Sequence, residues 1–186
     1  MSFELEDRVD RLEALLGRFI VQTEMAINEI RREGRRMSRQ WGELANKMGT
    51  LVEDIVAPNI PRIAKEYFRC EDIEFLGVRI LKRNQKDRTR HREFDVIAVC
   101  DDKIILNETK STPRQSYIEE FVEFLEKKEF FDYFPEYEGK EIIPVFASLY
   151  MQENTVSYLS NKGIYAMAIR EDTMDLINFE NISEGT

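Results

Sequence analysis

The sequence predicts an α/β protein in which a mixed sheet flanked by helices follows a long coiled-coil helix. Apolar residues between positions 3 and 40 alternate spacings of four and three, which is the repeat of a coiled coil. From residue 41 onward, helical and strand periodicities follow one another in the order αβββαβ and then αβ. The chain has 186 residues, of which 42% are hydrophobic, so one packed domain fits beside the helix. We therefore expect a coiled coil over residues 1–40 and a globular domain over residues 41–186.

The N-terminal helix carries an apolar stripe that needs a partner. A long isolated helix leaves such a stripe in water, so we expect homo-oligomerisation through residues 5–37. The oligomer is a dimer or a tetramer, with parallel or antiparallel helices. The alternative is that the stripe packs back on the chain's own domain. Eight of the ten stripe positions are apolar: Leu5, Val9, Leu12, Leu16, Phe19, Thr23, Ala26, Ile30, Glu33 and Met37.

Two further helices lead into the sheet. The apolar face of residues 38–56 predicts a second helix, which ends before Pro58. Residues 61–68 predict a short helix, and residues 75–81 predict the first strand.

Two strands joined by a tight turn form the most informative segment of the chain. Residues 96–99 and 104–106 are apolar runs, and the Asp101-Asp102 pair between them is typical of a turn. A two-residue loop sets Cys100 opposite Lys103 and thereby fixes the register of the hairpin.

That register gathers charged side chains on one face of the hairpin. Asp95 lies opposite Glu108, and Glu93 lies opposite Lys110, because residues two apart on a strand share a face. Like charges that face each other destabilise a hairpin, and a bound divalent cation removes this repulsion. Two acids, a lysine and an implied cation predict a phosphodiester-cleaving site. The alternative is a polar strand face with an exposed Glu93–Lys110 salt bridge.

The remaining elements complete the predicted order. Pro113 lies near the first turn of a helix, where a proline is tolerated. We expect a helix over residues 113–133, a buried strand over 141–151, a helix over 153–161, a strand over 163–169 and an edge strand over 174–179.

Asp95, followed by Glu108-Thr109-Lys110 on the next strand, resembles the PD-(D/E)XK motif of the restriction-endonuclease-like nuclease superfamily. Phe94 stands where the motif's name has proline, and Glu93-Phe94-Asp95 is similar to the Glu-x-Asp variant of several branches. The resemblance covers about residues 41–180, and the whole chain resembles prokaryotic proteins that join a coiled coil to such a domain. It implies a restriction-endonuclease-like αβββαβ core and an endonuclease that cleaves DNA rather than RNA.

The resemblance also implies a role for each motif residue. Asp95 and Glu108 would bind Mg²⁺ (or Mn²⁺), and the backbone carbonyl of Thr109 would complete the inner ligands. A bound cation neutralises charge at phosphorus and activates water. Lys110 would orient that water and stabilise the developing charge. Beside two carboxylates its ammonium should stay protonated, so we expect an electrostatic role.

Members of the superfamily often add an acid from the first core helix, and Glu53 is the matching residue. Helical geometry does not select it, because Glu53 and Asp54 lie on opposite flanks of the apolar stripe. The choice of Glu53 as a fourth catalytic residue rests on the resemblance alone.

Charge is distributed unevenly along the chain. The net charge is −9, yet residues 79–92 carry seven Lys or Arg against one Asp, and residues 31–39 carry five Arg against one Glu. The first run leads into the strand of Asp95, so it should follow a phosphate backbone. The expected nucleic-acid-binding residues are Lys82, Arg83, Lys86, Arg88, Arg90 and Arg92, joined by Arg114 and Gln115 at a helix start beside the site.

Cys70 and Cys100 lack metal-ligand spacing, and we expect buried, reduced thiols in a cytoplasmic protein. No apolar run is long enough for a membrane span. A catalytically silent nucleic-acid-binding or assembly module on the same fold is the alternative function.

Overall fold

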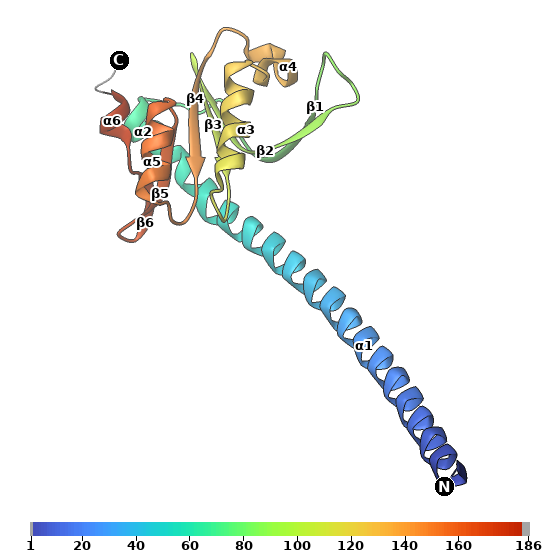
Figure 1. Cartoon of the computed structure of the whole chain (residues 1–186). Helices are drawn as coiled ribbons and strands as arrows, with labels where there is room; N and C mark the ends of the chain where they lie inside the picture. Colours follow the sequence, from blue (N-terminus) through green and yellow to red (C-terminus); the bar gives the residue numbers. More distant parts are fainter. Residues whose placement is uncertain (1, 184–186) are drawn as a thin grey trace. The chain divides into compact units, whose positions relative to one another are not determined.

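The structure, a computed structural model, describes residues 2–183, with the backbone alone for residues 2–10, 14, 41, 45 and 183. It is a mixed α/β protein with a long N-terminal helix and a six-stranded sheet (Figure 1). The chain divides into two compact units, Met1–Lys47 and Met48–Thr186. The coarse fold class predicted from the sequence is confirmed.

A single helix, α1, runs from Ser2 to Val56. The expected division into two helices near residue 38 is therefore wrong. Nothing in the sequence breaks the helix there, because a glycine such as Gly34 costs an exposed helix only about 1 kcal/mol and no proline occurs before Pro58. A short 3₁₀ turn then leads into α2 (Ile60–Phe68), which confirms the predicted short helix.

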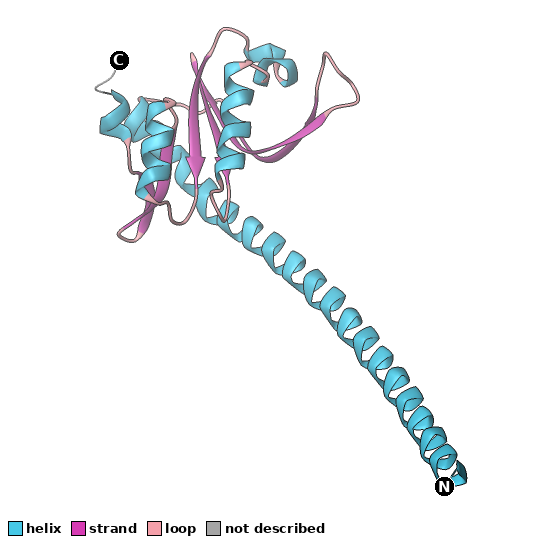
Figure 2. Cartoon of the chain, viewed as in Figure 1, coloured by secondary structure: helices cyan, strands magenta, loops and turns pink. Residues whose placement is uncertain are grey.

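The six strands lie in the sheet in their chain order. Strands β1 to β3 are antiparallel, β3 to β5 are parallel, and β6 is antiparallel to β5. Helices on both faces cover the sheet, as the core contacts show (Figure 2). The strands are β1 (Phe75–Arg83), β2 (His91–Cys100), β3 (Lys103–Thr109), β4 (Glu141–Ala147), β5 (Tyr165–Arg170) and β6 (Thr173–Leu176).

Several boundaries differ from those expected. The predicted helix over residues 113–133 is two helices, α3 (Gln115–Glu126) and α4 (Phe130–Tyr133), because Lys128 adopts a positive φ of 53° that a helix cannot continue through. Strand β4 ends at Ala147, four residues before the expected end. Helix α5 (Glu153–Asn161) is confirmed, and α6 (Phe179–Ser183) was not foreseen.

Two apolar clusters hold the sheet between its helices. One joins the end of α1 and α2 to one face of the sheet, and the other joins α3, α4 and α5 to the opposite face. The first contains Val52, Val56, Ile60, Ile63, Val96, Ala98, Ile105 and Val145; the second contains Phe94, Ile97, Val99, Leu106, Phe121, Phe130 and Phe146.

Cys70 and Cys100 form a disulfide with Cα atoms 5.9 Å apart, and both residues are buried. The expectation of two reduced thiols is therefore wrong. The pair links the segment after α2 to the end of β2, across 30 residues of sequence. The spacing of the two cysteines in the sequence gave no indication of this bond, because the two segments come together only when the sheet forms.

Candidate functional site

The hairpin of β2 and β3 has the predicted register. The two strands pair from Cys100 opposite Lys103 to Val96 opposite Asn107, so the next position sets Asp95 opposite Glu108. Beyond this point the Thr109 N–H donates to the side chain of Asp95, at 2.6 Å from Oδ2, and not to a backbone carbonyl of β2. The paired acids thus lie where the backbone pairing of β2 and β3 ends.

Lys110 lies against both acids. Its Nζ is 2.5 Å from Glu108 Oε1 and 3.7 Å from Asp95 Oδ2. The Asp95 and Glu108 side chains are only 10% and 15% exposed, so water screens their charges weakly. Glu93 is exposed and forms no ion pair with a described residue, so the alternative Glu93–Lys110 salt bridge is absent.

Arg92 holds the second oxygen of Glu108. Its Nη2 lies 3.4 Å from Glu108 Oε2, and its guanidinium stacks 3.9 Å from the centre of the Phe124 ring. Thr109 faces away from this cluster, since its buried hydroxyl donates to Asn107 Oδ1. Arg92 is therefore part of the acidic cluster rather than a free cation of the hairpin.

Three carboxylates and one ammonium set the electrostatics of the site. Burial, and then the charge of Glu108, raise the pKa of Asp95 to about 6, and Glu53 adds to this rise. Lys110 and the Thr109 N–H oppose it. Burial alone would lower the pKa of Lys110, but Glu108 and Asp95 outweigh it and raise that pKa. Lys110 is thus a cation at neutral pH, in agreement with the expected electrostatic role.

The charge of Glu53 acts on this cluster, and Glu53 is better buried than Asp54. The charge of Glu53 raises the pKa of both Asp95 and Lys110, whereas Asp54 contributes to neither. The Glu53 side chain is 18% exposed and that of Asp54 is 58% exposed. The choice of Glu53 as a catalytic residue stays a prediction that rests on the resemblance.

Arg79 holds this acidic pair, and the sequence gave no sign of it. Its Nε is 2.6 Å from Glu53 Oε2, and its Nη2 is 2.5 Å from Asp54 Oδ1. Arg79 has a φ of 52°, in the left-handed region, at the β1 position that faces Asp95. Next to Arg79, the Ile80 side chain lies over Gly77, so a Cβ on Gly77 would collide with Ile80 Cδ1.

The basic run of residues 79–92 forms the hairpin of β1 and β2, called the basic hairpin below. Most of its cations are already paired, so fewer are free to bind phosphate than the composition implied. Three of its cations pair with acids of the α4 region: Lys82 with Glu136, Lys86 with Asp132 and Arg90 with Glu129. Arg83 and Arg88 are exposed and form no ion pair with a described residue. At the start of α3, Arg114 is extended and exposed, and Gln115 donates to Glu119.

Among the residues that the structure describes, no group of three or more His, Cys, Asp or Glu is close enough to hold a metal ion. Asp95 and Glu108 fit a different kind of site. Magnesium is usually held by one or two carboxylates, with substrate phosphates and water as the other ligands. Burial and the charge of Glu108 both disfavour ionised Asp95, and a bound cation would oppose these two effects.

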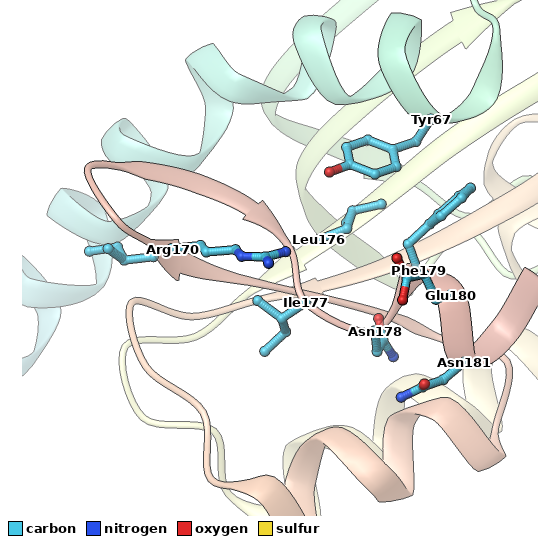
Figure 3. Close-up of a pocket in the computed structure, with 9 residues that line it drawn as sticks. Tyr67, Arg170, Leu176, Ile177, Asn178, Phe179, Glu180 and Asn181 are labelled. Atoms are coloured by element: carbon cyan, nitrogen blue, oxygen red, sulfur yellow. The ribbon is translucent and has the colours of Figure 1, made fainter.

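A separate pocket of about 410 Å³ lies by β5, β6 and α6 (Figure 3). Tyr67, Arg170 and Asn178 are among its lining residues, and the Tyr67 hydroxyl donates to Asp175. It contains neither an opposed acid pair nor any predicted site residue. The hairpin cluster is therefore the candidate active site.

Comparisons with protein-family models, curated proteins and solved structures found no match to this chain. None of the described helices combines the length and the apolar character that crossing a membrane requires.

Proposed function

We propose that this protein is a metal-dependent nuclease that hydrolyses phosphodiester bonds, with DNA as its substrate and Mg²⁺ or Mn²⁺ as its cofactor. The observation that carries the proposal is the opposition of Asp95 and Glu108, nearly buried, with the Lys110 ammonium against both. Shifted pKa values cluster at functional sites, and the pKa of Asp95 is raised to about 6.

The fold supports this proposal at a coarse level. Three antiparallel strands, a helix and a parallel strand follow α1 and α2 in the order that the resemblance implies. On this basis we assign the globular unit a restriction-endonuclease-like core. The acids lie on the second and third strands of that series, as the PD-(D/E)XK resemblance requires.

The chain's own groups would divide the work of hydrolysis. A bound Mg²⁺ would neutralise phosphate charge and supply an activated water. Asp95 and Glu108 would hold it, with the Thr109 carbonyl as a further ligand and Glu53 as an additional acid. Lys110, kept protonated by its carboxylate neighbours, would stabilise negative charge on the phosphoryl oxygens.

Nucleic acid would approach along exposed cations near the site. Arg83, Arg88 and Arg114 are exposed, and we assign them phosphate contacts. The other predicted contacts would first have to release their acidic partners, which are Glu136 for Lys82, Asp132 for Lys86, Glu129 for Arg90, Glu108 for Arg92 and Glu119 for Gln115.

A second copy of the chain would cover the stripe of α1. Leu12, Leu16, Phe19 and Ile30 are each more than 60% exposed in the single chain. Water-exposed apolar side chains in such a row favour association. We therefore propose a homo-oligomer through residues 5–37.

Internal pairing also favours a second candidate, a catalytically silent binding or assembly module. Lys110 already neutralises part of the acidic pair, and four hairpin cations are held by acids of the same chain. Such a protein would keep the fold without turnover.

Cleavage of a supercoiled plasmid and of labelled single-stranded and double-stranded DNA, with Mg²⁺ or Mn²⁺, separates the two candidates. We expect cleavage by the intact chain and by Asp102→Asn, a matched loss of one acid in the hairpin turn. We expect none from Asp95→Asn or Glu108→Gln. Intact DNA with every metal and substrate would establish the silent module instead.

A further inference from the structure

Five arginines of α1 form a basic face that the candidate site does not use. All five side chains are exposed, and none forms an ion pair or a side-chain hydrogen bond with any residue that the structure describes. They lie within one continuous helix, α1 (Figure 1). They are Arg31, Arg32, Arg35, Arg36 and Arg39.

Helical geometry gathers these arginines on one side. At 100° per residue they cover an arc of about 140°, and they extend over about 12 Å of helix. The apolar stripe passes through Ala26, Ile30 and Met37, whose mean direction is roughly 170° away by the same geometry. An α1 that pairs with another helix through its stripe would therefore leave the arginines in water.

The arginine face and the basic hairpin differ in whether their cations pair with acids of the same chain. Lys82, Lys86 and Arg90 are occupied by acids of the α4 region. By contrast, only Glu33 lies among the arginines of residues 31–39, and it forms no ion pair with a described residue. In a chain of net charge −9, this face is the largest block of cations without internal partners in the described residues.

We propose that the arginine face of α1 binds the phosphate backbone of a nucleic acid. Guanidinium groups form paired hydrogen bonds with phosphate oxygens, and release of condensed counterions drives their binding. Phosphate contacts of this kind position a protein without reading sequence. The proposal rests on the proposed function in taking nucleic acid as the ligand, but it does not require the chain to cleave it.

An anionic membrane surface is less well matched. A helix that lies in a membrane interface buries a broad apolar face beside its cations. Within residues 31–39 of α1, Met37 is the only large apolar side chain. The opposite side of the arginine segment also carries Glu33 in the stripe.

Fluorescence anisotropy of a labelled 30-base-pair duplex tests this inference, with EDTA present and Asp95→Asn in every chain so that cleavage plays no part. The variant combines Arg31→Gln, Arg35→Gln and Arg39→Gln, since glutamine keeps helix propensity. The charge-matched control combines Lys65→Gln, Lys127→Gln and Lys162→Gln, all exposed lysines outside both basic segments. Far-ultraviolet circular dichroism confirms that each chain is equally helical.

We expect the arginine variant to bind at least tenfold more weakly than its parent at the same salt concentration, and the control to stay within twofold. The slope of log K against log salt should fall by about 0.9 for each lost contact, or by about 2 to 3 for the triple variant. Equal binding by the variant and its parent, or an equal loss in the control, would overturn the inference. So would retention of the chain on anionic lipid vesicles with no binding of DNA. Binding without cleavage in the plasmid assay would refute the nuclease alone.

Discussion

Asp95→Asn should stabilise the folded protein at neutral pH, although it removes the candidate metal ligand. In the folded state the pKa of Asp95 is about 6, against 3.8 for the free side chain. The folded protein therefore binds an extra proton between these values, so stability falls as pH rises from about 4 to 6. Asparagine carries no charge and still offers an oxygen to the Thr109 N–H.

The size of the effect follows from the shift. One pKa unit corresponds to about 1.4 kcal/mol, so ionised Asp95 costs the fold about 3 kcal/mol above pH 6. Urea unfolding at pH 7.5 should show the variant more stable by up to about 3 kcal/mol, and unfolding at pH 3.5 should show no difference.

Metal should largely cancel this difference. Mg²⁺ at about 100 times its dissociation constant adds about 2.7 kcal/mol to a protein that binds it only when folded. The intact chain should gain this at pH 7.5, and Asp95→Asn should not. A difference between the two proteins that is equal at pH 3.5 and 7.5 would refute the reasoning about burial and charge at Asp95.

Three further outcomes follow from single features of the structure. Lys110→Met should lower the free energy of unfolding by about 2 kcal/mol at pH 7.5, because two largely buried carboxylates lose their cation. Mg²⁺ should restore more stability to this variant than to the intact chain. An unchanged urea midpoint would contradict this. Gly77→Ala should cost about 1–3 kcal/mol in thermal unfolding, because its methyl group would overlap Ile80, while alanine at the unobstructed Gly42 should be neutral or stabilising. Reduction of Cys70–Cys100 should lower the free energy of unfolding by about 3–4 kcal/mol, as expected for a loop of 30 residues, and free thiols in the native protein by mass spectrometry would show that the bond is absent.

The hairpin could be predicted because its determinants are local. Asp101-Asp102 fixes a two-residue turn, and alternation along β2 and β3 then sets Asp95 opposite Glu108. Short-range rules therefore gave the central acids of the candidate site and the face they share.

What the sequence did not reveal depends on contacts between distant segments. The pairing of Lys86 with Asp132 joins residues 46 positions apart, and no periodicity reports it. The left-handed conformation of Arg79 arises where β1 passes the end of α1. The Cys70–Cys100 bond also joins distant segments, and nothing near either cysteine in the sequence indicates that the two pair.

The helix boundary near residue 38 failed for a different reason. The stripe loses its apolar character in the arginine-rich segment around Gly34, but that loss does not end a helix. A helix ends only where its hydrogen bonds can no longer form, and the first such place is the segment before Pro58.

Calorimetric titration of Mn²⁺ into the full chain tests the central claim most directly. The account predicts binding by the intact protein and by Asp102→Asn, and no binding by Asp95→Asn or Glu108→Gln. A duplex with uncleavable phosphorothioate linkages is titrated in parallel, since substrate phosphates complete many such sites. Metal binding that survives both substitutions, or its absence from the intact protein with and without the duplex, would contradict the account.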